Sequence, residues 1–241
     1  MNILKGKSCR VSPQSKAKEH FMQHIKLNFA LASFLILSAF NQLFAQVPVR
    51  NEPRHKVILE NDYVRLLDVH IQPHDTTLVH IHAAPSVIVF LTRSSIATQI
   101  LGASPVDAEV QPAQTGYAAY DEKPVTHRVY NRGDSTFHVM DIELVKKTPA
   151  PESCAILSDP AAKLDQQQKL VRVYNIEIDK YKKLQIPKSS CAHLIIAITG
   201  KIGLSGGKKA IGPGDFLFYE PQEEIEIFGQ EHAQCVLLEL K

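Results

Sequence analysis

Short runs of β-branched and aromatic residues recur along the chain from Val57 onward, and turn residues separate them. The first group of runs is VILE, YVRLLDVHI, VIVFLT, IATQIL, GYAAY, HRVYN and FHVMDIEL, and the second is LVRVYNIEI, HLIIAITGKIGL, DFLFYE, EIEIF and QCVLLEL. No long segment shows the 3.6-residue period of an amphipathic helix. The pattern therefore predicts an all-β protein.

The two groups of runs predict two structural halves. Between them, Thr148-Pro149-Ala150-Pro151 breaks the pattern, and AAKLDQQQ, residues 161–168, is the only plausible helix. The segment SVIVFLTRSSI at 86–96 can be laid over HLIIAITGKIG at 193–203, and GYAAYDE over GDFLFYE. This weak internal duplication predicts two small antiparallel barrels, at 46–150 and 169–241, joined by a linker at 151–168.

An apolar block precedes the β pattern. It is LNFALASFLILSAF at 27–40, with Lys26 before it and small residues after it. A membrane-spanning helix needs about 20 apolar residues, and this block is shorter. We expect residues 1–45 to be a signal peptide, so that the protein is exported to the periplasm or secreted. The alternative is that this segment stays uncleaved as an anchor, which would be the protein's only link to a membrane. Whether translation starts at Met1 or Met22 stays open.

Charge argues against a nucleic-acid partner. The whole chain has 27 Lys and Arg against 25 Asp and Glu. Six of the basic residues and one acid lie in the leader, which leaves 21 basic against 24 acidic residues, a net charge of −3. A chain with this balance has no net positive charge to attract phosphates, so no nucleic acid is expected.

Three cysteines remain after the leader, and an odd number leaves at least one thiol unpaired. Cys191 and Cys235 both adjoin apolar runs and could form a disulfide, although sequence provides no distance between them. Burial of both as small apolar residues is the alternative.

Candidate chemistry gathers on the histidines. His80 and His82 are separated by one residue in a predicted strand, and alternate strand residues project to the same face, so both rings can reach one point. His127 opens a later strand run, HRVYN. In a closed barrel that strand could bring His127 to the same centre, which would suit a metal. His70 and His138 are expected to be surface or core-edge groups instead, and His55 and His232, in polar surroundings, carry no argument.

The offsets of these residues resemble the two motifs of the cupin superfamily. His80 and His82 match the histidines of the first motif, and His127 matches the histidine of the second, with Gly116 and Asn131 at its glycine and asparagine. The glutamate place of the first motif falls on Ser86. The resemblance implies a double-sheet jelly roll and a metal held by His80, His82 and His127.

Three neutral imidazoles would suit a divalent metal ion such as Fe, Zn, Cu, Ni or Mn, and the sequence does not decide which. Asp121 or Glu122 could serve as a replacement carboxylate ligand, although solvated turn residues are the simpler interpretation. In the second half, Pro187-Lys188-Ser189 stands at the HxH place and Ile225 at the later histidine place. That half is expected to be a metal-free packing module.

These expectations favour an exported two-barrel cupin that acts on a small-molecule substrate, in the manner of a metal-dependent dioxygenase or related oxidoreductase. A non-catalytic exported protein that binds a metal or small ligand, and a metal-free structural module that dimerises, are the alternatives. Whether a homodimer forms stays open, since Lys180 to Lys183 could blunt an edge strand.

Overall fold

The computed structural model describes residues 47–146, 154–204 and 209–241. Within these ranges the secondary structure consists of β-strands and one 3-10 turn, η1 (Val49–Asn51), with no α-helix. The all-β prediction is confirmed. The predicted leader and the Thr148–Pro151 break lie outside the described residues. In the described part of the chain, no helix is long and apolar enough to cross a membrane.

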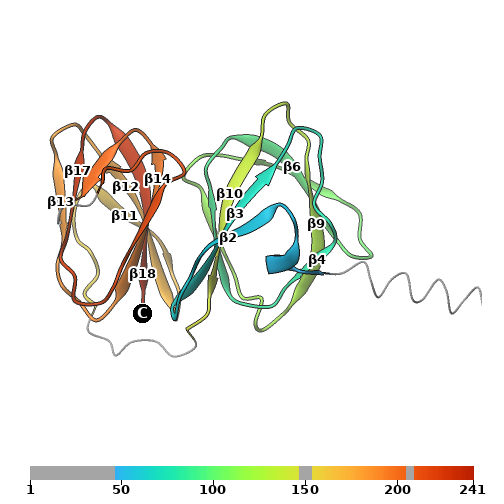
Figure 1. Cartoon of the computed structure of the whole chain (residues 1–241), viewed down its shortest axis with the longest axis horizontal. Helices are drawn as coiled ribbons and strands as arrows, with labels where there is room; N and C mark the ends of the chain where they lie inside the picture. Colours follow the sequence, from blue (N-terminus) through green and yellow to red (C-terminus); the bar gives the residue numbers. More distant parts are fainter. Residues whose placement is uncertain (1–46, 147–153, 205–208) are drawn as a thin grey trace, which may run out of the picture. The chain divides into compact units, whose positions relative to one another are not determined.

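The first half consists of two five-stranded sheets (Figure 1). One sheet has the order β1 (Val47–Pro48), β4 (His80–His82), β9 (Val125–Asn131), β6 (Ser94–Ile100) and β7 (Val106–Val110). The other has the order β2 (His55–Glu60), β3 (Val64–Ile71), β10 (Phe137–Leu144), β5 (Ser86–Phe90) and β8 (Thr115–Ala118). Leu67 and Val139 from one sheet pack with Ile96 and Val110 from the other, so the two sheets enclose a common core. This is the double-sheet arrangement of a jelly roll.

The second half repeats this plan with fewer strands. Its larger sheet has the order β11 (Ala162–Gln167), β12 (Val171–Ile178), β18 (Ala233–Leu240), β14 (Ala192–Thr199) and β16 (Phe216–Tyr219). Its smaller sheet has the order β13 (Lys183–Ile186), β17 (Ile225–Gly229) and β15 (Ile202–Leu204). The segments that align in sequence occupy matching places in the two sheet orders, β5 with β14 and β8 with β16. The topology thus bears out the internal duplication.

Strand β11 corrects one expectation. Its residues were the plausible helix of the predicted linker, and they instead pair antiparallel with β12, from Ala162↔Ile176 to Gln167↔Arg172. Ala, Lys and Gln have good helix propensity, but propensity is a weak preference that a sheet edge can override. Part of the predicted linker therefore belongs to the sheet of the second half, and the remaining domain boundaries stay predictions.

One buried cluster takes side chains from both halves. Leu66 and Met140 of the first half belong to the same cluster as Leu194 and Val236 of the second, and all four are fully buried. These residues lie on the faces of β3, β10, β14 and β18 that point away from the interior of their own barrel. Apolar side chains on both faces explain why these strands are near-continuous apolar runs.

The disulfide expectation was wrong in its partner. Cys191 is bonded to Cys154, and Cys235 is a free, buried cysteine. Cys235 lies on β18 with its side chain in the core of the second half, where it packs as a small apolar group. The odd cysteine count did indicate that one thiol stays unpaired.

Candidate metal centre

The short strand β4 presents two imidazoles to the interior of the first half. His80 and His82 are buried, whereas Ile81 between them is only partly so, which is the alternation that a strand imposes. The Nε2 atoms of His80 and His82 are 3.0 Å apart.

Strand β9 brings the third predicted histidine to this pair. β9 pairs antiparallel with β4, and His127 lies directly across from His80 in the register. The Nε2 atom of His127 is 3.1 Å from Nε2 of His80, and its ring centroid is 4.9 Å from that of His82. The three histidines singled out in the sequence thus converge, although 47 residues separate His80 from His127.

The other ring nitrogens are directed away from the meeting point. Nδ1 of His80 lies 2.8 Å from the carbonyl oxygen of Leu78, which can only accept, so Nδ1 carries the proton and Nε2 has the lone pair. Nδ1 of His82 faces an Asp141 carboxylate oxygen at 3.3 Å. A histidine whose outer N–H is held by a carbonyl or carboxylate is the usual arrangement of a metal ligand.

Asp141 is a candidate site residue that the sequence did not single out. It is 3% exposed, and neither of its oxygens nor Nδ1 of His82 has a hydrogen bond of good geometry. A buried carboxylate without hydrogen bonds is costly, and a cation bound by the neighbouring histidines would offset that cost. The detectable signal was the polar residue Asp141 following Val139 on the inward face of β10.

His55 is the second such residue, because its polar surroundings in the sequence carried no argument for a role. It is 8% exposed, and its ring centroid lies 4.7 Å from that of His80. His55, His80 and His82 each offer a ligand atom within 4.8 Å of the others. Nδ1 of His55 is 2.7 Å from an Oε atom of Glu52, which leaves Nε2 free to bind.

Glu52 is a buried carboxylate that holds His55 and the adjacent backbone in place. Its carboxylate accepts hydrogen bonds from the backbone N–H groups of Leu78 and Arg54 in addition to His55. Burial raises the pKa of Glu52, but these hydrogen bonds outweigh burial and lower it to about 2. Glu52 is therefore ionised, and it positions both His55 and the Leu78 backbone, whose carbonyl in turn holds His80.

Burial keeps the central imidazoles neutral. Burial and the neighbouring His55 lower the pKa of His80 to about 4, and burial with His80 and His82 nearby lowers the pKa of His127 to about 3. Near neutral pH these rings keep the unprotonated nitrogens that metal ligands require.

The separations between the imidazole nitrogens suit a bound divalent ion. Two imidazole nitrogens at 2.0–2.1 Å from one metal lie about 2.9 to 3.4 Å apart at octahedral or tetrahedral angles. The Nε2 pairs at 3.0 and 3.1 Å fall within this range. Because His80 directs a lone pair at two other Nε2 atoms, a cation between the three rings would satisfy all of them.

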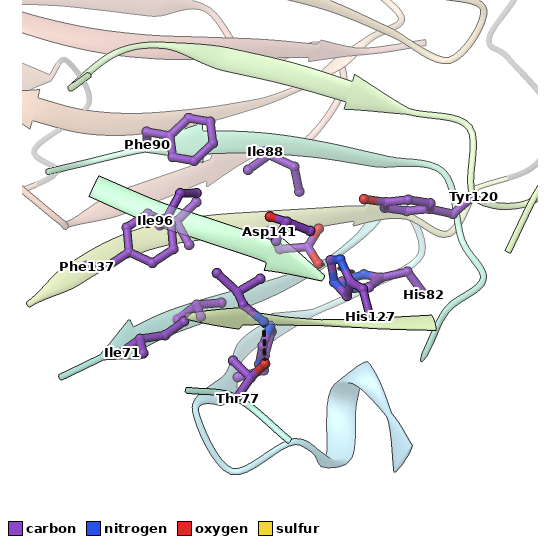
Figure 2. Close-up of a pocket in the computed structure, with 15 residues that line it drawn as sticks. Ile71, Thr77, His82, Ile88, Phe90, Ile96, Tyr120, His127, Phe137 and Asp141 are labelled. Carbon is purple, nitrogen blue, oxygen red and sulfur yellow. Dashed lines mark hydrogen bonds and ion pairs between the residues drawn. The ribbon is translucent and has the colours of Figure 1, made fainter. Parts of the chain in front are cut away.

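A cavity of about 210 Å³ adjoins the histidines. Figure 2 shows His82, His127 and Tyr120 gathered toward one end and the rings of Phe90 and Phe137 toward the other. Burial, with Asp141 nearby, raises the pKa of Tyr120 to about 12, so its phenol stays protonated and able to donate. The described residues that line the cavity include no Lys or Arg.

The remaining candidate ligands lie elsewhere. Asp121 and Glu122 are exposed and do not line the cavity. Ser86, at the place of the motif glutamate, is buried and donates its hydroxyl hydrogen to the carbonyl of Ala84. No carboxylate therefore comes from the motif position, and Asp141 on a different strand is the acid near His82.

The second half has other residues at the HxH place than the sequence comparison put there. The inward residues of β13 are Leu184 and Ile186, which pair with Ile227 and Ile225 of β17, as His80 and His82 pair with β9. Apolar side chains, rather than Pro187 to Ser189, thus occupy the HxH place, and all four are buried.

Comparison with solved structures supports the cupin resemblance at the level of the fold. The bacterial pirin YhhW from Escherichia coli, in complex with nickel(II), superposes with a TM-score of 0.57 at 15% identity, over 77% of this chain and 90% of that chain. Salicylate 1,2-dioxygenase from Pseudaminobacter salicylatoxidans superposes with a TM-score of 0.55 at 9% identity, over 74% and 71%. AerE from Microcystis aeruginosa has a TM-score of 0.51 at 13% identity, over 79% and 98%. No model of a known family and no curated protein sequence matches the chain.

Proposed function

We propose that this chain, which has the fold of the cupin superfamily, is an exported protein that binds a divalent metal and acts as an oxidoreductase on a small organic molecule. The observation that carries the proposal is the convergence of Nε2 of His80, His82 and His127 at 3.0 and 3.1 Å. His55 is a fourth nitrogen within reach. In the Escherichia coli pirin the corresponding fold is in complex with nickel(II), which supports a metal here without identifying it.

The metal would supply Lewis acidity toward an oxygen atom of a substrate or of O2. The protein would contribute the surroundings. Asp141 would hold the His82 ring through Nδ1, and the Leu78 carbonyl would hold His80. Tyr120, protonated and lining the cavity, can donate a hydrogen bond to a substrate oxygen.

The cavity favours a small, largely apolar substrate. Its volume of about 210 Å³ lies below the range of about 300 to 1,000 Å³ that is usual for drug-sized ligands. Aliphatic and phenyl side chains form most of its wall, and its described lining residues include no Lys or Arg. A phenol or an enol fits these conditions, because its oxygen can reach the histidines while its carbon skeleton contacts the apolar wall.

Metal analysis of the purified full chain tests the binding step. We expect a stoichiometric divalent metal in the wild-type protein and its loss in His80→Ala and in His127→Ala. His232→Ala is the matched control, because His232 is exposed and hydrogen-bonds Asp179 outside the cavity. A wild-type protein without metal, or an His80→Ala variant that keeps it, contradicts the proposal.

Oxygen consumption tests the catalytic step. With a panel of small phenols and enols, we expect O2 uptake that depends on both substrate and metal and is absent in His80→Ala. If the metal is present and no member of the panel is oxidised, the alternative of a non-catalytic exported metal-binding protein is favoured.

Export rests on two observations. The leader has the pattern of a signal peptide. The Cys154–Cys191 disulfide is typical of an oxidising compartment. N-terminal sequencing of the protein from the periplasm or medium should begin at Gln46. Recovery of the full chain from the cytoplasm alone would contradict export.

A further inference from the structure

We propose that Asp68, His70 and His138 form a second metal site, selective for zinc and similar ions, on the face of the β2-β3-β10-β5-β8 sheet that points away from the histidine cavity. Asp68 and His70 are alternate residues of β3, and His138 lies directly opposite His70 on β10. The residues on either side of Asp68, Leu67 and Val69, face the interior core. The three polar residues therefore share the opposite face.

The ligand atoms of this cluster already meet. Nε2 of His138 is 2.7 Å from one carboxylate oxygen of Asp68, and Nε2 of His70 is 3.1 Å from the other. The two imidazoles are stacked, with ring centroids 3.9 Å apart and an angle of 24° between the planes. One ligand atom from each residue lies within 4.8 Å of the other two.

Two imidazoles and one carboxylate make a donor set that Zn²⁺ binds tetrahedrally, with an outside molecule as fourth ligand. Ligand atoms of a tetrahedral site lie about 3.3 to 3.4 Å apart, so the 2.7 Å separation between His138 and Asp68 has to widen by roughly half an ångström, whereas the 3.1 Å separation between His70 and Asp68 nearly fits. Rotation of the Asp68 carboxylate and of the exposed His70 ring about their side-chain bonds can supply these changes.

The cluster is fixed by the backbone and open to solvent. β3 and β10 pair without a register shift from Phe137↔Ile71 to Leu144↔Val64, so the spacing of His70 and His138 is set by the sheet. The His70 side chain is 45% exposed, whereas those of Asp68 and His138 are 23% and 18% exposed. An ion can therefore enter from the His70 side and keep a water molecule there.

A neighbouring segment of the second half leaves room for the His138 ring. Gly214 of the second half has a φ of +83°, and a Cβ atom at this position would lie 3.3 Å from Cε1 of His138. On the same face of the sheet as Asp68 and His138, Leu66 and Met140 are fully buried in the apolar cluster shared by both halves. The site thus lies at the edge of a rigid apolar contact, which limits how far its ligands can move apart.

Zinc binding by the full, metal-stripped chain tests this site. After dialysis against buffer with micromolar free Zn²⁺, elemental analysis should find two zinc ions per chain in the wild type and one in His70→Ala and in Asp68→Asn. The His80→Ala/His127→Ala double variant should also hold one, because it keeps only the outer site. His232→Ala should hold two, since His232 is an exposed histidine with carboxylates Glu177 and Asp179 beside it but no second imidazole.

Thermal unfolding supplies a second readout. In the His80→Ala/His127→Ala background, zinc should raise the melting temperature, because a ligand that binds only the folded state stabilises it. Adding His70→Ala should abolish that rise. The proposal is overturned if His70→Ala and Asp68→Asn, with wild-type circular dichroism, bind as much zinc as the wild type. If the wild type binds one zinc ion and only the Asp68 and His70 substitutions remove it, the cavity does not bind zinc and the outer site does.

Discussion

Replacement of Glu52 by Gln should destabilise the metal-free protein by an amount that depends on pH. The Glu52 carboxylate is 1% exposed, and hydrogen bonds to it outweigh burial and lower its pKa from 4.5 to about 2. Because the folded-state pKa is depressed, the stabilising contribution is complete above the unfolded-state pKa and is lost as the pH falls through the folded-state pKa. The contribution of Glu52 to the free energy of unfolding is therefore lost as the pH falls from about 4.5 to about 2.

The magnitude follows from linkage. A pKa lowered from 4.5 to about 2 contributes about 3 kcal/mol to the free energy of unfolding at pH 7. At pH 3.5 Glu52 is protonated in most of the unfolded ensemble but still ionised in the folded state, and the contribution falls to about 2 kcal/mol. The difference in unfolding free energy between wild type and Glu52→Gln should thus narrow by about 1 kcal/mol between these two pH values.

Urea unfolding with linear extrapolation at pH 7 and pH 3.5 measures this difference. Other groups titrate in both proteins, so their contributions cancel in the comparison. Glu60→Gln is the matched control, because Glu60 pairs with Arg65 and Arg50 at the exposed surface, and its unfolding midpoint should barely change. A difference that stays constant with pH, or one no larger than that of the control, would refute the role assigned to the buried carboxylate.

Three further changes test other parts of the structure. Asp141→Asn should weaken metal affinity by about 10 to 100-fold in a chelator competition, because the amide holds Nδ1 of His82 less well; unchanged affinity would contradict the role of Asp141. Cys154→Ser should lower the unfolding free energy by about 4 kcal/mol, since the bridge closes a loop with a sequence separation of 37, and a reducing agent should then have no additional effect in urea unfolding. Leu194→Ala should lower the free energy of unfolding by about 3 to 5 kcal/mol. Because Leu194 belongs to the cluster shared by both halves, near-UV circular dichroism should still follow a single unfolding transition. Two separate transitions would show that the halves unfold independently.

Periodicity and spacing in the sequence predicted much of this protein. The β-branched runs indicated an all-β chain, and the alignment of residues 86–96 with 193–203 indicated a repeat that reappears in the matching places of β5 and β14. His80 and His82 could be placed on one face because strand alternation is local. The offset of His127 matched a known motif, and the register of β4 and β9 brings it to His80.

Only the tertiary structure decided which distant residues join these histidines. His55 and Asp141 lie on β2 and β10, and their approach to the site depends on sheet packing and strand register, which no local pattern encodes. The same holds for Cys154, whose pairing with Cys191 requires a distance, and for residues 162–167, where pairing with β12 overrides helix propensity. Local preferences amount to a few tenths of a kcal/mol per residue, whereas burial and a complete hydrogen-bond ladder involve several kcal/mol per strand, so the long-range contacts prevail.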